Sequence, residues 1–287
     1  MNYRTPLFRI SLAFTCLVLS PRLGIAQNKP APPSLTVPPL KEARVVATCV
    51  ECPAPFDTVT HTQILNSLAA NPYVAELRRA LYFQDSIHQF ESKAHFDNCD
   101  FESATAYISL LLEETGQHVE KALAAKQAGG KAEVDGAVRN AFFALGQAMH
   151  ATQDFYAHTN YVELTVASAK KTDDIDVVEP WTAAGRERIG QLRQSGLVSG
   201  FVFWGFPQKC ASGAPSHADL AKDSADTKSG KKSVPHLQNL SQYRIAVFLA
   251  QKASISLARY AFQRWPLLKE VSGNDIAFEV ILDHRGA

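Results

Sequence analysis

The chain has 287 residues, of which 46% are hydrophobic, and its 29 Lys and Arg residues nearly balance its 28 Asp and Glu residues. This length and apolar content suffice for one large domain with a sizeable core, and they exclude collagen-like, coiled-coil and wholly disordered proteins. The formal net charge of +1 gives no electrostatic basis for a stable nucleic-acid partner, which normally contacts a basic face. The composition leaves a nucleic acid only the role of a transient substrate.

The first residues have the pattern of a secretory signal peptide. Arg4 and Arg9 precede the apolar run ISLAFTCLVLS, and the small residues Gly24 and Ala26 suit cleavage after Ala26. An uncleaved membrane anchor is one alternative, but the run is shorter than the roughly 20 apolar residues that a spanning helix needs. A lipoprotein attached through Cys16 is another, although AFTC lacks the usual pattern ahead of the cysteine. We expect residues 1–26 to be removed and the protein to be exported, as a periplasmic or secreted protein.

A proline-rich tether and a cysteine-containing domain are expected to follow. The stretch NKPAPPSLTVPPL lies within residues 27–48 and is typical of a polyproline-like linker, so the folded domain is expected to span residues 49–287. An even number of cysteines in an exported domain indicates disulfides, with three pairings open for Cys49, Cys52, Cys99 and Cys210. A zinc knuckle or a thioredoxin-like centre at Cys49 and Cys52 lacks a second CxxC or a βαβ pattern.

The hydrophobic periodicity beyond this point is helical almost throughout. It predicts helices over residues 57–71, 74–90 and 101–126, from about 132 through the central motif, over 183–194, and from about 236 past 261. Between the last two lies a loop of small and polar residues over 207–235, and a loop of that length is usually functional or disordered. The expected fold is a single all-α domain, a multi-helix bundle with sites between its helices.

The central motif LGQAMHATQDFYAHTNYVEL, residues 145–164, places His150, Asp154 and His158 along one helix face. An ordinary solvated face is the simplest interpretation. However, residues 141–158 contain no Lys, Arg or Glu, which predicts a buried helix. A buried carboxylate needs a strong partner. A metal ion is such a partner for imidazole and carboxylate groups stacked at four-residue steps.

Further metal-ligand types occur in other segments. They are His61 in VTHTQIL, Asp85 in YFQDSIHQF, His95 and Asp97 in AHFDNCDF, and His217, Asp219 and Asp223 in SHADLAKDS. His118 lies on the face of the helix over 101–126 and is expected to be a hydrogen-bonded core residue or to orient a ligand. His236 is expected to open the last helix, and His284 near the terminus to be inert.

The central motif is similar over nearly its whole length to that of the HET-C (heterokaryon-incompatibility protein C) family, and AHFDN and SHADLAKDS resemble its flanking motifs. A remoter resemblance, from about His61 to the last helix, is to the bacterial zinc-dependent phospholipases C and the single-strand-specific zinc nucleases. That superfamily is all-α and binds three zinc ions in a cleft. The resemblance therefore implies a bundle of the phospholipase C type that holds two to three zinc ions.

Carried over position by position, the resemblance implies the metal ligands His61, Asp85, His95, His150, Asp154, His158 and His217. Asp154 would bridge two ions. Asp223 and Asp219 are additional candidates, since the enzymes place an acid four residues after the late histidine and this chain has Ala221 there, and Asp97 beside His95 is another. In the enzymes the mature amino group is also a ligand just ahead of the first histidine, whereas here a long stretch separates Ala26 from His61. His158 lies closer to Asp154 than in the phospholipases.

The chemistry implied is hydrolysis of a phosphodiester by metal-activated water, with Asp154 as the central catalytic carboxylate and Asn160, Gln153 and His118 orienting the ligands. The expected partners are a phospholipid or another phosphodiester as substrate and a membrane surface where a lipid would be met. One alternative is a non-catalytic HET-C-like module, in which a structural metal supports binding of a lipid or protein partner. Another is an exported helical domain with incidental histidines.

Overall fold

The computed structural model describes residues 72–272. The expected signal peptide, the proline-rich tether, the helix over 57–71 with His61, and His284 lie outside these residues. So do Cys49 and Cys52.

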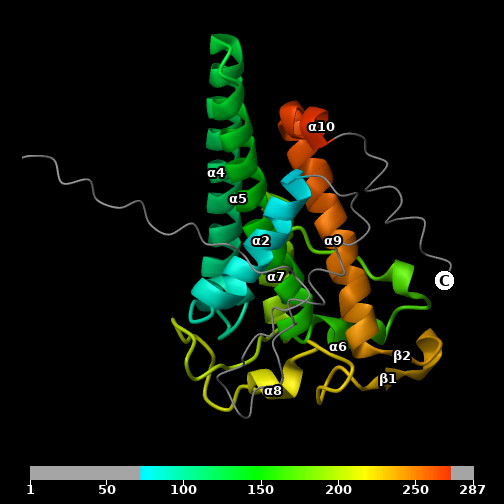
Figure 1. Ribbon diagram of the computed structural model, residues 1–287. Coiled ribbons are helices and arrows are strands. Elements are labelled where there is room, and N and C mark those ends of the chain that lie inside the picture. The colour runs from blue at the N-terminus through cyan, green and yellow to red at the C-terminus, as the bar shows by residue number, and fades with distance from the viewer. Residues whose placement is uncertain (1–71, 273–287) are drawn as a thin grey trace, which may run out of the picture. The chain divides into compact units, whose positions relative to one another are not determined.

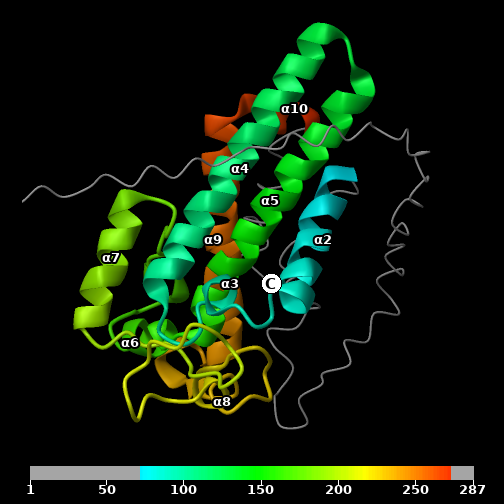
Figure 2. The ribbon, with the colours of Figure 1, turned by 90° about the vertical axis from the view of Figure 1, so that its left-hand side faces the viewer.

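A central helix, α5 (Lys131–His158), organises the described part of the chain. It forms an antiparallel hairpin with α4 (Phe101–Ala128), and the two run side by side in both ribbon views (Figures 1 and 2). The helices α2 (Pro72–Ile87) and α9 (Gln242–Arg264) pack against other sides of α5. Because α2, α4 and α9 all contact α5, the C-terminal half of this helix is buried and can carry a buried site.

Local sequence explains where the hairpin begins and turns. Asp100 caps the start of α4 by accepting a hydrogen bond from the backbone N–H of Ser103. At the other end, Gly129 has a φ of 78°, a left-handed conformation that glycine adopts without a Cβ penalty. Gly130 then precedes α5, so two glycines make the tight reversal that the sequence predicts.

Shorter elements gather around the lower end of the bundle in Figure 1. They are α3 (Ser92–His95), α6 (Tyr161–Val166), η1 (Thr172–Asp174), α7 (Ala183–Gln194), α8 (His217–Leu220), η2 (Pro235–Leu237) and the antiparallel pair β1 (Ser233–Val234) and β2 (Leu240–Ser241). The helix α10 (Pro266–Ser272) packs on α9. The described chain is therefore all-α apart from one two-residue strand pair.

The C-terminal half of α5 is buried on every side, as its lack of Lys, Arg and Glu predicts. Each residue from Ala144 to His158 is buried. Gly146 permits close packing, because a Cβ at this position would lie 2.7 Å from the Ala80 Cβ and 2.8 Å from the Leu77 oxygen of α2. The polar groups of this half of α5 therefore lie inside the protein rather than on a solvated face.

The expected start of the last helix at His236 is wrong. The helix α9 begins at Gln242, where Ser241 accepts a hydrogen bond from the Arg244 N–H and caps it. His236 instead lies in η2, between the paired strands, and its Nε2 donates to the Val166 oxygen over 2.8 Å. The segment 207–235, expected to be a loop of small and polar residues, contains α8, β1 and the fully buried Lys222 and Asp223.

Within residues 72–272, every helix is too short or too polar to span a bilayer.

Candidate metal site

The first group of metal-ligand side chains joins three helices. Asp85 comes from α2, His95 from α3, and His150 and Asp154 from α5. His150 Nε2 lies 3.0 Å from Asp154 Oδ2, 3.2 Å from His95 Nδ1 and 3.5 Å from Asp85 Oδ1. His95 Nδ1 is itself 2.9 Å from Asp154 Oδ2. Four donor atoms thus converge in a buried space.

The second group joins α5 to the segments around α3 and α8. His158 Nε2 lies 3.1 Å from Asp223 Oδ1, and His217 Nε2 lies 3.3 Å from Asp223 Oδ2. Asp97 faces both rings, with an oxygen 3.0 Å from His217 Nδ1 and the other 3.6 Å from His158 Nδ1. This group is slightly more accessible than the first, because the His217 side chain is 13% exposed whereas His150 is fully buried.

The two groups are neighbours. His158 Nδ1 donates to the backbone oxygen of His95 over 2.8 Å, and the two imidazole centroids are 6.4 Å apart. This hydrogen bond puts the proton of a neutral His158 on Nδ1 and leaves the Nε2 lone pair directed at Asp223. A backbone acceptor behind the ring is the usual support of a metal-binding histidine.

An unusual backbone turn directs His95 and Asp97 to different groups. Phe96, Asn98 and Cys99 have φ values of 51°, 57° and 57°, the left-handed region that side chains other than glycine seldom adopt. Such conformations cost free energy and persist where the surroundings hold them in place. The turn lets two residues that are only two positions apart serve separate groups.

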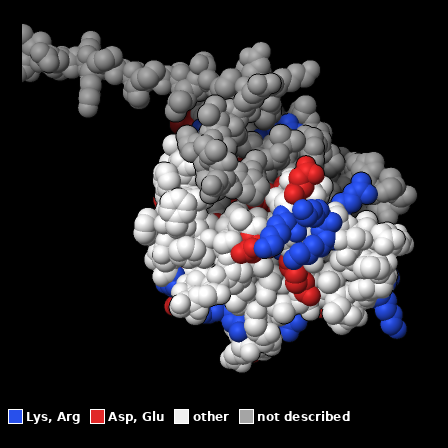
Figure 3. All heavy atoms as spheres, turned by 90° about the horizontal axis from the view of Figure 1, so that it is seen from below, with Lys and Arg blue, Asp and Glu red and all other residues white. Residues whose placement is uncertain are grey.

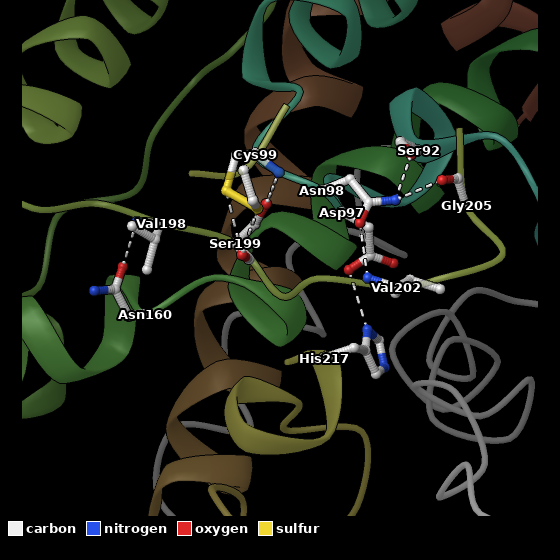
Figure 4. Close-up of a disulfide and its surroundings, with 11 residues drawn as sticks. Ser92, Asp97, Asn98, Cys99, Asn160, Val198, Ser199, Val202, Gly205 and His217 are labelled. Atoms are coloured by element: carbon white, nitrogen blue, oxygen red, sulfur yellow. Dashed lines mark hydrogen bonds and ion pairs between the residues drawn. A yellow bond between two sulfur atoms is a disulfide. The ribbon is translucent and has the colours of Figure 1, made fainter. Parts of the chain in front are cut away.

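Asn98 and the disulfide hold this turn (Figure 4). The buried Asn98 side chain donates to Ser92 Oγ and to the Gly205 oxygen, and accepts from the Val202 N–H over 2.7 Å. Cys99 is bonded to Cys210, as the preference for disulfides in the sequence predicts. The segment that bears His95 and Asp97 is thereby fixed to residues 199–210, which lead to α8.

The buried Lys222 places Asp223. Its ammonium donates to the Thr159 and Leu220 oxygens at 2.8 and 2.7 Å and pairs with Glu163 at 3.2 Å. Its backbone N–H also bonds the Ala157 oxygen. The segment after α8 is thus anchored to the end of α5, which brings Asp223 next to His158.

Burial and charge act in opposite directions on these groups. Burial lowers the pKa of His217, but the nearby Asp97 and Asp223 carboxylates raise it, to about 9 overall. The pKa values of His95 and His158 are likewise raised, since neighbouring carboxylates outweigh burial. Burial raises the pKa of Asp223, but His158 and His217 lower it to about 2. The carboxylates therefore favour a positive charge beside them, whether a protonated imidazole or a metal ion.

The donor set fits a metal ion. With metal–ligand bonds of about 2.0–2.2 Å, the ligands of a tetrahedral ion lie roughly 3.3–3.6 Å apart, close to the separations of 2.9–3.5 Å in the first group. A single proton on His150 Nε2 cannot bond Asp85, Asp154 and the facing His95 nitrogen at once, whereas one cation can bind the ligand atoms of Asp85, His95 and His150, which all lie within 4.8 Å of one another. The second group has the same residue types, but Asp97 faces the Nδ1 atoms of His158 and His217 whereas Asp223 faces their Nε2 atoms, so an ion would be held with one of the two carboxylates.

The remaining predicted residues lie elsewhere. Asp219 accepts from Ser216 and pairs with Lys228, so it caps α8 rather than facing His217. Asn160 bonds Gly196 and Val198, and Gln153 donates to Ser254 of α9. His118 pairs with Glu114, about 25 Å along α4 from Phe101 at 1.5 Å per residue. Ala221, where the enzymes have an acid, is buried.

The sequence interpretation missed Asn98 and Lys222. The only signal for Asn98 was its residue type, because asparagine tolerates the left-handed conformation better than most residues. A lysine between two short polar runs gives no periodic signal of burial, so the sequence does not indicate that Lys222 is buried.

The fold and the site define an all-α protein with two adjacent His/Asp groups that could hold metal ions. Residues 88–176 match the family model described as heterokaryon incompatibility protein Het-C. The resemblance to the HET-C family is thereby confirmed over these residues, which include His95, Asp97, His150, Asp154 and His158. No curated protein and no solved structure matches the chain.

Proposed function

We propose that this protein is an exported, zinc-dependent phosphodiester hydrolase of the phospholipase C type. The observation that carries the proposal is the convergence of four imidazoles and four carboxylates into two adjacent buried groups. Imidazole nitrogens favour zinc over magnesium or calcium, which prefer oxygen ligands. No serine or cysteine nucleophile is needed by such a site.

The side chains of the two groups would have different roles in the proposed hydrolysis. When bound, zinc supplies a water of pKa near 7 and stabilises charge on phosphoryl oxygens. Asp154 Oδ2 contacts both imidazoles of the first group, so Asp154 would be a central ligand of an ion held there. The His95 backbone oxygen holds the His158 ring in orientation. His217, the most exposed of the four histidines, faces the side from which a substrate would approach.

A non-catalytic module with structural metal is the second candidate. It is favoured by the nearly complete burial of His150 and Asp154, at 0% and 1% side-chain exposure, and by the four side chains that meet in the first group. Structural zinc sites have four protein ligands, whereas catalytic sites leave a position open. In this function the metal would hold α2, α3 and α5 together while the protein binds a lipid or protein partner.

Metal analysis and hydrolysis assays distinguish these functions. The purified mature protein should contain zinc, and with zinc it should hydrolyse bis(p-nitrophenyl) phosphate or phosphatidylcholine. We expect Asp154→Asn to lower turnover by at least about a hundredfold, which is the scale for loss of a group that stabilises the transition state. The matched control is Asp219→Asn, because Asp219 pairs with Lys228. Zinc without turnover above that of Asp154→Asn would establish the structural function, and absence of bound metal would overturn both.

Export and processing complete the proposal. The Cys99–Cys210 disulfide supports export, because such bonds persist in oxidising compartments. We place the signal peptide at residues 1–26, the tether at 27–48 and the helical domain at 49–287. Mass spectrometry of the protein from the culture medium or periplasm should find Gln27 at the mature N-terminus. Retention of the full N-terminus in the cytosol would contradict export.

A further inference from the structure

An exposed aromatic loop lies beside the second metal group. The loop comprises residues 201–206, FVFWGF, in which Phe203 and Phe206 are 70% and 64% exposed and Phe201 is also exposed. Phe90, 53% exposed, joins it through the backbone, since the Phe206 N–H donates to the Phe90 oxygen. Large aromatic side chains exposed together usually mark a binding surface.

The loop is held in place rather than loosely exposed. Asn98 bonds the backbone of Val202 and Gly205, and the Ser92 N–H donates to the Phe206 oxygen. On the C-terminal side of the loop, the Cys99–Cys210 disulfide fixes the chain. Figure 4 shows this disulfide next to Asn98 and Ser199. The exposed rings are therefore presented by a pre-organised backbone, which lowers the entropic cost of binding.

Internal hydrogen bonds also satisfy much of the loop's backbone. The Phe201 N–H donates to the Pro215 oxygen, and the Phe201 oxygen accepts from the His217 N–H. Gln208 Nε2 donates to the oxygens of Val202 and Phe203. Backbone groups without partners are costly in an apolar medium, so a loop with internally bonded groups is suited to enter one.

The charge distribution favours a lipid over a protein partner. From Gly196 to Ala218 the only Lys, Arg, Asp or Glu is Lys209, and its ammonium is paired with Asp100. Seen from the end that carries α8, most of the visible described surface is uncharged, with one cluster of basic and acidic side chains near its middle and further Lys and Arg side chains along its edges (Figure 3). Phenylalanine and tryptophan suit the interfacial layer of a bilayer, and the acid that bridges the loop, Glu91 opposite Phe206, is paired with Lys93.

We propose that the aromatic loop inserts into the interfacial layer of a phospholipid bilayer and docks this end of the protein on the membrane. The Phe201 and His217 backbones are hydrogen-bonded, and a Cβ at Gly200 would lie 2.4 Å from the His217 Cα. The inserted loop would thus bring the second metal group to the lipid surface. Docking does not require hydrolysis, so it can succeed or fail independently of the proposed enzyme activity.

Vesicle binding tests this proposal on the full mature protein. Wild type should co-sediment with vesicles of phosphatidylcholine containing a minor share of phosphatidylglycerol. Phe203→Ser combined with Phe206→Ser should weaken binding by at least about tenfold, because two largely exposed rings lose their apolar contact with lipid. The matched control is Leu110→Ser combined with Leu123→Ser, which removes two exposed side chains of α4, 59% and 44% exposed. The single variant Phe203→Ser should give an intermediate loss.

A second readout locates the contact. Quenching of tryptophan fluorescence by brominated lipid should be strong in wild type and weak in Trp204→Phe, while Trp181 and Trp265 remain in both proteins. Circular dichroism should show unchanged helix content in every variant. Failure of wild type to bind vesicles, or an equal loss in the α4 control, would overturn the proposal. So would a change of oligomeric state in the Phe203→Ser, Phe206→Ser variant with vesicle binding unchanged, because the loop would then be a protein interface.

Discussion

The imidazole Nδ1 of His158 lies 2.8 Å from the backbone oxygen of His95, and this hydrogen bond connects the two candidate metal groups. One group therefore depends on the backbone position of a ligand in the other. A substitution in either group should therefore change metal binding at both, and variants of single residues can measure this change.

Replacing His150 or His158 should remove metal. His150→Ala deletes the ring nitrogen that lies within 3.5 Å of three other donors, and we expect metal affinity at the first group to fall at least about a hundredfold. His158→Ala should reduce metal bound at both groups. Metal content after dialysis, measured by mass spectrometry, checks this. His118→Ala is the control, since His118 pairs with Glu114, and an equal loss in that variant would contradict the assignment.

Asp223 and Asp219 should behave differently although both follow His217 closely. Asp223→Asn removes a carboxylate that contacts both His158 and His217, so the amount of metal bound per chain should fall. Asp219→Asn should leave metal content unchanged and only weaken the cap of α8 and the pair with Lys228. Metal titration of both variants measures the difference. Loss of metal in Asp219→Asn alone would assign the late acidic ligand to Asp219 instead.

Metal affinity should rise with pH. In the metal-free protein the pKa of His217 is raised to about 9, and the pKa values of His95 and His158 are also raised. Zinc binds the neutral imidazole, so protons compete with it below pH 9. The apparent affinity should therefore increase between pH 6 and pH 9, by up to about tenfold per pH unit for each proton displaced. Competition with a chelator measures it, and an affinity that does not change over this range would contradict the assigned ligands.

The side chain of Asn98 should stabilise the ligand-bearing turn. Asn98→Ala removes three hydrogen bonds, two of them to the aromatic loop, and leaves a left-handed backbone at a residue that disfavours it. We expect a loss of about 2–4 kcal/mol in the free energy of unfolding. Denaturant unfolding of the metal-free protein measures it. Asn160→Ala is a matched control on a more exposed asparagine and should cost about 1 kcal/mol.

Much of the bundle could be predicted from the sequence because its helices have local signals. The helix over 183–194 has the predicted bounds, and the reversal at Gly129 follows from glycine's freedom at positive φ. Local signals also led to the error at His236. The apolar stripe of α9 gives no sign of the strand pair ahead of it, whose formation depends on the pairing of Ser233 with Ser241.

The site was only partly predictable for a related reason. His150, Asp154 and His158 lie on one helix, where spacing determines which side chains share a face. Asp97 and Asp223 reach the second group through a left-handed turn and a buried lysine, neither of which has a periodic signature. Spacing therefore predicted that His150, Asp154 and His158 share a face of α5, whereas tertiary contacts decide which of the loop carboxylates lie beside them.

The Cys99–Cys210 disulfide should stabilise the protein substantially. The two cysteines are 111 residues apart, so the bond closes a long loop, and Cys99→Ser combined with Cys210→Ser is expected to cost about 2–5 kcal/mol. Thermal unfolding of the variant and of wild type, each with and without zinc, measures the cost. An unchanged melting temperature would contradict a structural role for this bond.

Because Cys99 lies only two residues after Asp97, the same bond has a consequence for how the protein matures. Thiol oxidation fixes the segment on which Asp97 sits to the segment that leads to His217. Chains kept in a reducing compartment would then capture metal poorly, and full loading would follow only after oxidation. For the exported hydrolase proposed above, such an order would prevent activity toward the producing cell's own phosphodiesters until the protein has left the cytosol.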